Sequence, residues 1–408
     1  MRNALRRCTR RHILISEPIR LEKQLLLCCI RPFLDSEEVK RLAVLLKQDI
    51  DWEYLVRIAL AQQVLPQLYR TLQSTPPNAV PRGILDQLRY QLQKNTEWNL
   101  FVSHIFINLL QLFERNGIPT IPFKGPTLAA SVYGNLGLRQ FADLDILVRE
   151  SDYPNAQQLL SAMGFSRVKQ FEWESTFVGG KYAIAVDLHK RMTSQEFSCP
   201  LDFEYLLKRL KSVVIDGIKV GTLSPEVTLL MLAVQITKDA GTPYLQLIKI
   251  CDIDQLFRAH LDFDLRGTLS QANELGCERM VLFSLCLAHH LLGTPLPQEI
   301  LDEAHAQPVI HQLVEFTRRR LFDGPDWGAN DRRSIDLFRW HVRERVRDKL
   351  HPYYIRYVHA TFVPCSLDGQ LLSLPERFAF LHYIIRPIRL TCKYGLLFLR
   401  GRIERNVP

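Results

Sequence analysis

Two aspartates, Asp143 and Asp145, alternate with apolar residues in the segment Ala-Asp-Leu-Asp-Ile-Leu-Val at 142–148. This alternation predicts a β-strand, on which residues two apart point to the same face, roughly 6.5–7 Å apart along the chain. Two carboxylates on one face, backed by hydrophobic residues, are costly unless a cation neutralises them. Mg²⁺ is usually held by one or two carboxylates together with substrate phosphates. The pattern therefore indicates a metal site that handles phosphates, although Asp143 and Asp145 alone would also suit a solvated end of a strand.

A third carboxylate, Asp187, lies in a second apolar segment, Ile-Ala-Val-Asp-Leu-His at 184–189. Asp187 and His189 would share one face of that strand. If the two strands pair, three carboxylates converge, as in sites where two metal ions clamp the attacking and leaving oxygens of phosphoryl transfer. We therefore interpret Asp143, Asp145 and Asp187 as candidate metal ligands and catalytic residues. His189 is either a residue of the acceptor side or an ordinary hydrogen-bonded histidine at a strand end.

Two basic residues that could bind a triphosphate precede the paired aspartates in the sequence. Lys124 would act as a point charge, and Arg139 could grip phosphate oxygens with two parallel hydrogen bonds. Gly125 opens a predicted helix at 125–132, where a glycine lets the backbone approach a phosphate, although Pro126 removes one amide donor. Lys124, Gly125 and Arg139 are therefore candidate nucleotide-binding residues. The alternative for both cations is a surface charge on a loop.

A second aspartate pair, Asp252 and Asp254, falls in a helical pattern over 245–260. Positions two apart on a helix do not share a face. We interpret these two as packing or hydrogen-bonding residues.

The candidate residues lie in an α/β unit between two helical regions. Strands are predicted at 118–123, 142–148, 165–169, 172–178 and 182–189, with a hairpin of 213–215 and 219–223 around Asp216-Gly217. Helical periodicity ends at Gly117 and resumes after Ser224, a typical helix N-cap. The predicted fold class is α+β with a small mixed β-sheet. We divide the chain into an N-terminal helical region (1–116), the core (117–223), a helical domain (224–330) and a basic C-terminal extension (331–408).

Composition narrows the class of protein. The chain of 408 residues is 47% hydrophobic and 23% charged, which excludes global disorder. The net charge of +9 comes from the ends: residues 1–24 hold seven Lys and Arg against two Glu, and residues 331–408 hold fifteen against seven Asp and Glu. The middle is mildly acidic, so there is no strong nucleic-acid signal. The basic tail also contains aromatic residues, which leaves peripheral contact with an anionic membrane open.

Cysteine usage and apolar runs predict a cytoplasmic protein. The nine cysteines have no C-x-x-C spacing, so we interpret them as buried thiols in a reducing compartment. No apolar stretch suits a signal peptide or a membrane span. The P-loop, the dinucleotide-binding fingerprint and the nucleophile elbow are absent.

The order of the motifs resembles the uncharacterised nucleotidyltransferase family of the polymerase-β-like superfamily. The matching motifs are Lys124-Gly125, Arg139, Asp143-Leu144-Asp145-Ile146-Leu147-Val148, a helix ending in Gly164-Phe165, and Val186-Asp187-Leu188-His189. The resemblance covers 117–189 most closely and extends over 42–69 and 223–296. It implies a nucleotidyltransferase palm with flanking helices, an NTP donor, and Mg²⁺ with Mn²⁺ as an alternative. On the matching positions it implies metal ligands at Asp143 and Asp145 and a third carboxylate at Asp187.

The chain departs from the family pattern at three places, one of which is Lys190, because an aromatic residue often follows the histidine at 189. Histidines are expected near Gln235 and Asp239, where only Lys238 matches, so Lys238 joins His189 as a candidate for the acceptor side. The helix opening is Gly125-Pro126 instead of the Gly-Ser or Gly-Gly of the superfamily.

These observations favour an Mg²⁺-dependent enzyme that transfers a nucleoside monophosphate from an NTP to an unidentified hydroxyl or phosphate acceptor. The acceptor could belong to a sugar, a small molecule, a peptide or a protein. One alternative is a metal-dependent glycosyltransferase that binds a sugar nucleotide through Asp143-Leu144-Asp145. Another is a non-catalytic nucleotide-binding scaffold with a degenerate site, which the residues at Gln235 and Asp239 would allow.

Overall fold

The computed structural model describes residues 19–194, 197, 199–240, 242, 244–260, 262–322, 332–354, 360–363 and 380–390. The chain divides into two compact units, Met1–Val342 and Arg343–Pro408, and every candidate site residue lies in the first. Within the described ranges, no helix is both long enough and apolar enough to cross a membrane. Much of the basic tail, including Arg377 and Lys393, lies outside the described residues, so its membrane contact stays a prediction.

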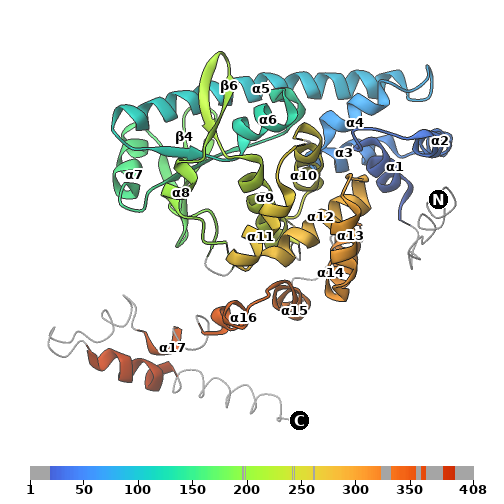
Figure 1. Ribbon diagram of the computed structural model, residues 1–408. Coiled ribbons are helices and arrows are strands. Elements are labelled where there is room, and N and C mark those ends of the chain that lie inside the picture. Colours follow the sequence, from blue (N-terminus) through green and yellow to red (C-terminus); the bar gives the residue numbers. More distant parts are fainter. Residues whose placement is uncertain are drawn as a thin grey trace, which may run out of the picture. The chain divides into compact units, whose positions relative to one another are not determined.

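Figure 1 shows the sheet at its upper left, around the label β4. This five-stranded mixed sheet carries the candidate carboxylates, in the strand order β1-β2-β5-β4-β3. Its strands are β1 (Thr120–Pro122), β2 (Asp143–Val148), β3 (Ser166–Gln170), β4 (Glu174–Gly179) and β5 (Ile184–His189). β2 and β5 run parallel, and the other neighbours run antiparallel. The predicted α+β class with a small mixed sheet is confirmed, as is the pairing of the two aspartate-bearing strands.

One face of this sheet is apolar and packs on helices. Leu144 and Ile146 of β2 and Val186 of β5 are fully buried in one core with residues of α5 (Arg82–Arg115) and α7 (Tyr153–Ala162). Side chains alternate between the two faces of a strand, so the aspartates of β2 and β5 share the opposite face. The alternation read from the sequence therefore directs the carboxylates away from the core.

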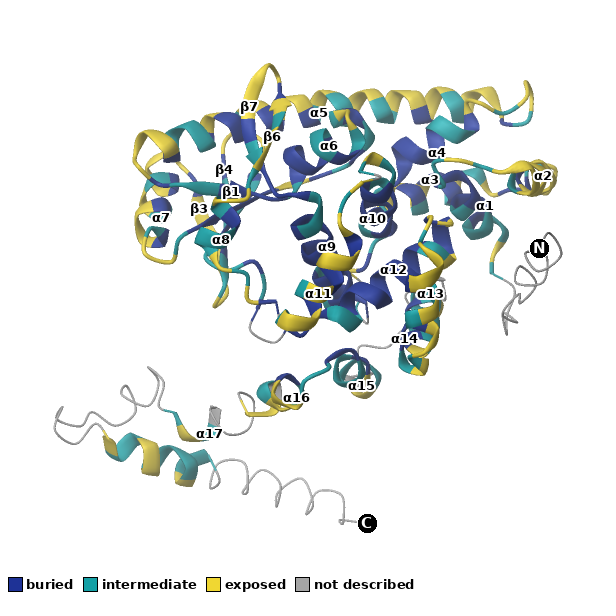
Figure 2. Cartoon of the chain, viewed as in Figure 1, coloured by how far each residue is buried: buried dark blue, intermediate teal, exposed yellow. Residues whose placement is uncertain are grey.

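A single helix, α5, continues for 34 residues and supports both the sheet and the segment before β2. No Gly or Pro interrupts 84–115, so the helix can continue without a break. The helix ends at Asn116, followed by Gly117 with φ of 69°. Figure 2 shows one side of α5 exposed and the side facing the sheet buried. α5 also packs against α4 (Leu65–Leu72), α6 (Gly125–Tyr133) and η1 (Leu136–Leu138).

Turn residues explain the two hairpins. Asp216 and Gly217, both at positive φ, join β6 (Lys211–Ile215) to β7 (Ile218–Thr222), as their sequence predicts. The connection from β4 to β5 is longer than predicted, because residues 180–183 form the turn and Ala183 takes a φ of 51°. β5 therefore begins at Ile184 instead of at 182, which changes its register with β4.

Helices before and after the sheet share one hydrophobic core, which contains Leu25 and Leu55 from the front and Leu230 and Leu285 from the rear. The remaining helices of the first unit are α1 (Leu21–Cys29), α2 (Ser36–Leu45), α3 (Trp52–Ala61), α8 (Phe203–Leu207), α9 (Pro225–Asp239), α10 (Leu247–Ala259), α11 (Leu265–Leu275), α12 (Glu278–Leu292), α13 (Gln298–His305), α14 (Pro308–Phe322) and α15 (Arg332–Val342). The second unit contains α16 (Val346–Tyr353), α17 (Ala360–Phe362) and a helical stretch at 382–390. The domain limits at 116, 223 and 330 stay predictions.

The cysteines of the described part are buried: Cys28, Cys29, Cys199, Cys251, Cys277 and Cys286. They behave as small apolar residues, as the sequence predicts. Cys8, Cys365 and Cys392 lie outside the described residues.

Candidate active site

Asp145 of β2 and Asp187 of β5 are direct register partners on neighbouring parallel strands. Such strands lie about 4.8 Å apart, so the two carboxylates are neighbours. The Asp145 side chain is 2% exposed. Asp145 Oδ2 and Asp187 Oδ1 are buried without a hydrogen-bond partner. Buried carboxylate oxygens of this kind are costly, so the pair calls for a cation.

Asp143 begins β2 and lies two residues before Asp145, on the same face of the strand. It is exposed, in contrast to Asp145. Enclosure of its carboxylate by the surrounding protein, together with the charge of Asp145, raises the pKa of Asp143. Asp143 thus lies at the open edge of the site.

Two side chains meet at one oxygen of Asp145. Lys124 Nζ lies 2.7 Å from Asp145 Oδ1, and His189 Nε2 lies 3.1 Å from the same atom. Burial acts to raise the pKa of Asp145, but Lys124 and His189 outweigh it and hold that pKa below its usual range. Burial likewise acts to lower the pKa of Lys124, and Asp145 and Asp143 outweigh it, so the pKa of Lys124 is raised. Asp145 and Lys124 therefore form a charged pair at neutral pH.

Asp187 has the opposite electrostatic environment. Burial and the charge of Asp145 raise the pKa of Asp187 to about 6, against a lowering contribution from the Thr176 hydroxyl. Thr176 is the register partner of Asp187 on β4. Asp187 can therefore gain or lose a proton near neutral pH.

Glu174 is a site residue that the sequence reasoning missed. It begins β4 opposite His189, and its Oε2 lies 3.2 Å from His189 Nδ1. The contact is a close approach without the alignment of a hydrogen bond. The turn predicted at 179–181 would pair His189 with Phe171. The longer turn of the structure pairs His189 with Glu174 instead, so the length of the turn is the signal that identifies Glu174. The imidazole thus lies between Glu174 and Asp145.

Gly125 brings the start of α6 close to β2. Its φ is +51°, and a Cβ at this position would lie 3.1 Å from the backbone oxygen of Asp143. Only glycine accepts both conditions without strain. The N-terminus of α6 therefore lies beside the strand that carries Asp143 and Asp145, a suitable place for a phosphate. The nucleotide-binding role of Gly125 stays a prediction.

Arg139 is placed differently from what the sequence suggested. Its Nε and Nη2 donate to Asp252 Oδ1 and Oδ2, each at 2.9 Å, and both side chains are buried. Tyr133 donates its hydroxyl to Asp252 Oδ1 at 2.7 Å. Arg139 is therefore a buried, paired cation and not a surface charge. Its contact with a donor phosphate stays a prediction.

The interpretation of Asp252 and Asp254 as hydrogen-bonding residues is confirmed. Asp254 accepts from Thr294 Oγ1 at 2.8 Å and from Arg258 Nε at 2.9 Å. The two aspartates therefore have separate partners, as their spacing on α10 requires.

The region around Gln235 and Asp239, where the family resemblance leads us to expect histidines, contains an ion pair. Asp239, at the end of α9, lies 2.6 Å from Lys249 Nζ of α10 through its Oδ2. Lys238 is half-buried on the same helix. Its role on the acceptor side stays a prediction.

The donor set fits an Mg²⁺ ion that completes its coordination with substrate oxygens. Within the described part of the chain, no group of three or more His, Cys, Asp and Glu forms a complete metal site. Asp145 and Asp187 offer unpartnered buried oxygens on adjacent strands, with Asp143 beside them. Mg²⁺ is commonly bound by one or two carboxylates, substrate phosphates and water. The residues present therefore fit this ion.

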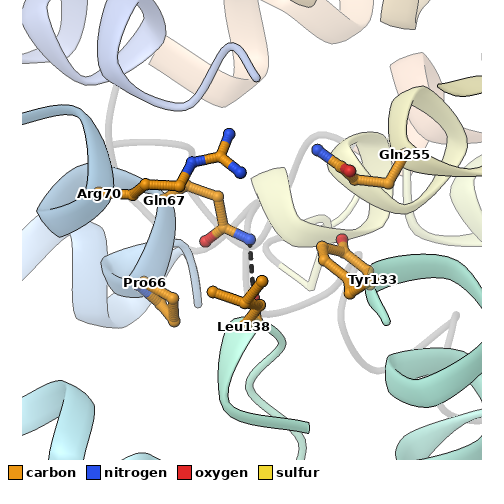
Figure 3. Close-up of a pocket in the computed structure, with 6 residues that line it drawn as sticks. All are labelled: Pro66, Gln67, Arg70, Tyr133, Leu138 and Gln255. Carbon is orange, nitrogen blue, oxygen red and sulfur yellow. Dashed lines mark hydrogen bonds between the residues drawn. The ribbon is translucent and has the colours of Figure 1, made fainter. Parts of the chain in front are cut away.

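Figure 3 shows a small pocket of about 50 Å³. Its lining residues are Pro66, Gln67, Arg70, Tyr133, Leu138 and Gln255. Gln67 Nε2 donates to the Leu138 carbonyl at 3.0 Å, the bond drawn in Figure 3. The pocket borders the segment that precedes β2 through Leu138, and Asp143, Asp145 and Asp187 are not among its lining residues.

The sequence pattern of the uncharacterised nucleotidyltransferase family matches residues 48–293, more than half of the chain. The chain belongs to this family. The nucleotidyltransferase is therefore an enzyme that transfers nucleotidyl groups, and the predicted family and enzyme class are confirmed. No curated protein matches its sequence.

Three solved structures are similar to parts of this nucleotidyltransferase. The lincomycin-bound lincosamide antibiotic adenylyltransferase LnuA is 18% identical, with a TM-score of 0.28 over 37% of this chain and 92% of that chain. ANT(2″)-Ia in complex with adenylyl-2″-tobramycin is 14% identical, with a TM-score of 0.31 over 43% and 95%. An antigenic nucleotidyltransferase-like protein from Paracoccidioides brasiliensis is 16% identical, with a TM-score of 0.31 over 52% and 91%.

Proposed function

We propose that this nucleotidyltransferase uses Mg²⁺ to transfer a nucleoside monophosphate from an NTP to a hydroxyl or phosphate of an acceptor molecule. The acceptor oxygen forms a bond to the α-phosphorus, the bond from that phosphorus to the bridging oxygen breaks, and pyrophosphate leaves. A sugar, another small molecule, a peptide or a protein could supply the acceptor oxygen. Family membership favours this reaction over sugar transfer through Asp143-Leu144-Asp145.

One observation carries the proposal: Asp145 and Asp187 are register partners, and each has a buried carboxylate oxygen without a partner. A structural ion pair would satisfy both oxygens internally. Here Lys124 and His189 satisfy only Asp145 Oδ1. The remaining oxygens suit a ligand from outside the chain, and the mildly acidic site suits a cation.

Asp143, Asp145 and Asp187 would hold Mg²⁺, which when bound polarises the α-phosphate and stabilises the charge on the pyrophosphate. Asp187 orients the acceptor hydroxyl and takes its proton. Its pKa of about 6 lies close to the range in which a general base works near neutral pH. Asp145 stays anionic, because Lys124 and His189 lower its pKa.

The donor phosphates would bind beside Lys124 and the N-terminus of α6. Lys124 Nζ supplies a positive charge next to Asp145, and Gly125 lets the backbone approach closely. Arg139 adds a fixed charge nearby, since it lowers the pKa of Asp143 from its place beside Asp252. Lys124 and Arg139 would supply the positive charge beside the phosphates, and Gly125 the space for their close approach.

Label transfer from NTPs tests this function. The four NTPs, labelled at the α- or the γ-phosphate, are incubated with the protein, Mg²⁺ and a metabolite extract. We expect α-label to enter a new product and γ-label to appear in pyrophosphate. Transfer of the γ-label to the product would contradict the proposal, because it indicates a kinase reaction. EDTA should abolish the transfer and Mn²⁺ should restore it.

A variant separates this activity from contaminating enzymes. Asp145→Asn keeps the size of the side chain and removes the charge that Lys124 and His189 contact. Asp302→Asn, an exposed aspartate on α13, is the matched control. We expect product from the control and none from Asp145→Asn. Equal product from both would overturn the assignment.

A further inference from the structure

The segment that leads into β2 is held by side-chain amides from two helices. Asn99 Nδ2 of α5 donates to the carbonyls of Leu136 and Arg139, at 2.6 and 2.8 Å. Asn95 Nδ2 donates to the Gly137 carbonyl at 3.1 Å, and Gln67 Nε2 of α4 donates to the Leu138 carbonyl at 3.0 Å. Every carbonyl from 136 to 139 therefore accepts from a side chain.

The fit of this segment against α5 leaves little room for movement. A Cβ on Gly137 would lie 2.5 Å from Thr96 Oγ1, so the backbone approaches the helix as closely as a glycine permits. Asn99 is fully buried between the helix and the segment. The segment is thus pinned on the α5 side four residues before Asp143.

Asp252 of α10 holds the same segment through the side chain of Arg139. Its carboxylate accepts two bonds from Arg139 at 2.9 Å and one from Tyr133 at 2.7 Å. Both side chains of the ion pair are less than 10% exposed. The partners lie 113 residues apart, so a helix that follows the core fixes a cation within the core.

Stability alone is a weak reason for such a pair. Buried ion pairs can often be replaced by apolar residues without loss, whereas their geometry fixes where a charge lies. Arg139 lies four residues before Asp143, on the segment that enters β2, so its pairing with Asp252 fixes where the strand that carries Asp143 begins.

We propose that Asp252 is a positioning residue of the nucleotidyltransferase site: by holding Arg139 it fixes the segment that leads into β2, and so places Asp143 for the metal-bound NTP. This inference rests on the proposed function. Asp252 acts through Arg139 and does not touch the substrate.

The competing explanation is that Asp252 only stabilises the packing of α10 against the core. Asp254 offers the matched control, because it lies on the same helix, is 0% exposed like Asp252, and is also paired with an arginine. Its partners, Arg258 and Thr294, lie outside the segment before β2. Losing either carboxylate breaks a buried ion pair, but only the loss of Asp252 should weaken nucleotide binding.

Titration calorimetry with NTP and Mg²⁺ tests the inference on the full chain. The NTP that binds wild type most tightly among ATP, CTP, GTP and UTP is used for Asp252→Asn, Asp254→Asn, Asp252→Glu and Tyr133→Phe. We expect Asp252→Asn to weaken NTP binding at least tenfold and Asp254→Asn to change it less than twofold, at similar losses in melting temperature. Asp252→Glu should recover most of the affinity, because it keeps the carboxylate.

Equal weakening by both Asn variants, or no weakening by Asp252→Asn, would overturn the inference. If Asp252→Asn fails to fold, Tyr133→Phe decides, because it removes the hydrogen bond that orients the Asp252 carboxylate toward Arg139. We then expect a two- to fivefold weakening, and unchanged affinity would overturn the inference. Failure of wild type to bind any NTP would instead overturn the proposed function. Binding that Asp143→Asn abolishes and Asp252→Asn leaves unchanged would overturn the positioning role alone.

Discussion

Asp145 and Asp187 stand side by side on β2 and β5, yet their surroundings shift their pKa values in opposite directions. Asp145 is paired with Lys124 and stays ionised. Asp187 has a pKa of about 6, because burial and the neighbouring Asp145 disfavour its charged form. Two acids whose environments separate their pKa values can divide the work of charge stabilisation and proton transfer. This division matches the roles proposed for the two residues.

Asp187→Asn should stabilise the metal-free protein in a pH-dependent way. The native state binds this proton more tightly than the unfolded state, whose Asp pKa is about 3.9, so wild-type stability falls as the pH rises from about 4 to about 6. Asparagine removes that dependence. We expect a gain on the order of 2 kcal/mol at pH 7.5 and little gain at pH 4, measured by urea unfolding in EDTA. Equal gains at both pH values would contradict the prediction.

Lys124→Met should make the protein more responsive to Mg²⁺. The variant loses the cation that contacts Asp145 Oδ1, and we expect a destabilisation of about 1–3 kcal/mol in EDTA, reduced by the partial exposure of Lys124. Added Mg²⁺ should then raise the melting temperature more than it does in wild type, because Asp145 has lost its internal counter-ion. An identical Mg²⁺ response in both proteins would show that Asp145 does not face a metal.

Glu174→Gln should lower activity without loss of the fold. Glu174 approaches His189 Nδ1, and the ring contacts Asp145 through Nε2. Removing a residue that supports a metal ligand typically costs about 10–100-fold in activity or metal affinity. Glu172→Gln, an exposed glutamate paired with Arg191, is the control. Turnover is measured beside melting temperature, and equal turnover in the two variants would remove Glu174 from the site.

Asp143→Ala should abolish turnover and leave the melting temperature close to that of wild type. Asp143 is exposed at the start of β2, so its loss costs little in packing. Loss of one charge-stabilising group at a reacting centre commonly lowers kcat by about 10²–10³-fold. Asp152→Ala, on the loop after the same strand, is the control. Normal turnover of Asp143→Ala would rule out the assigned site.

Local signals in the sequence were sufficient to predict the strands of the core. The alternation around Asp143 and Asp145 and the Asp216-Gly217 turn depend on neighbouring residues only, and the structure has β2 and the β6–β7 hairpin at those places. The register of β4 against β5 depended on the turn. The sequence suggested 179–181, whereas Ala183 takes a left-handed conformation and lengthens the loop, which brings Glu174 to His189.

The sequence does not indicate which residues far apart in the chain contact each other. Arg139 was expected to be open to a phosphate, and its actual partner, Asp252, lies 113 residues later on another helix. A single chain offers many carboxylates to each arginine, and nothing in the spacing selects one. The hydrogen bonds from the side-chain amides of Asn95, Asn99 and Gln67 to the segment before β2 could not be predicted, for the same reason.

A crystal structure with Mn²⁺ and a non-hydrolysable NTP tests the central claim most directly. The anomalous signal of manganese locates the ion independently of the assigned site. We expect a peak bound by Asp145 and Asp187, with Asp143 beside it and the triphosphate near Lys124 and Gly125. A manganese peak elsewhere in the chain, or a nucleotide bound away from these three carboxylates, would contradict the account.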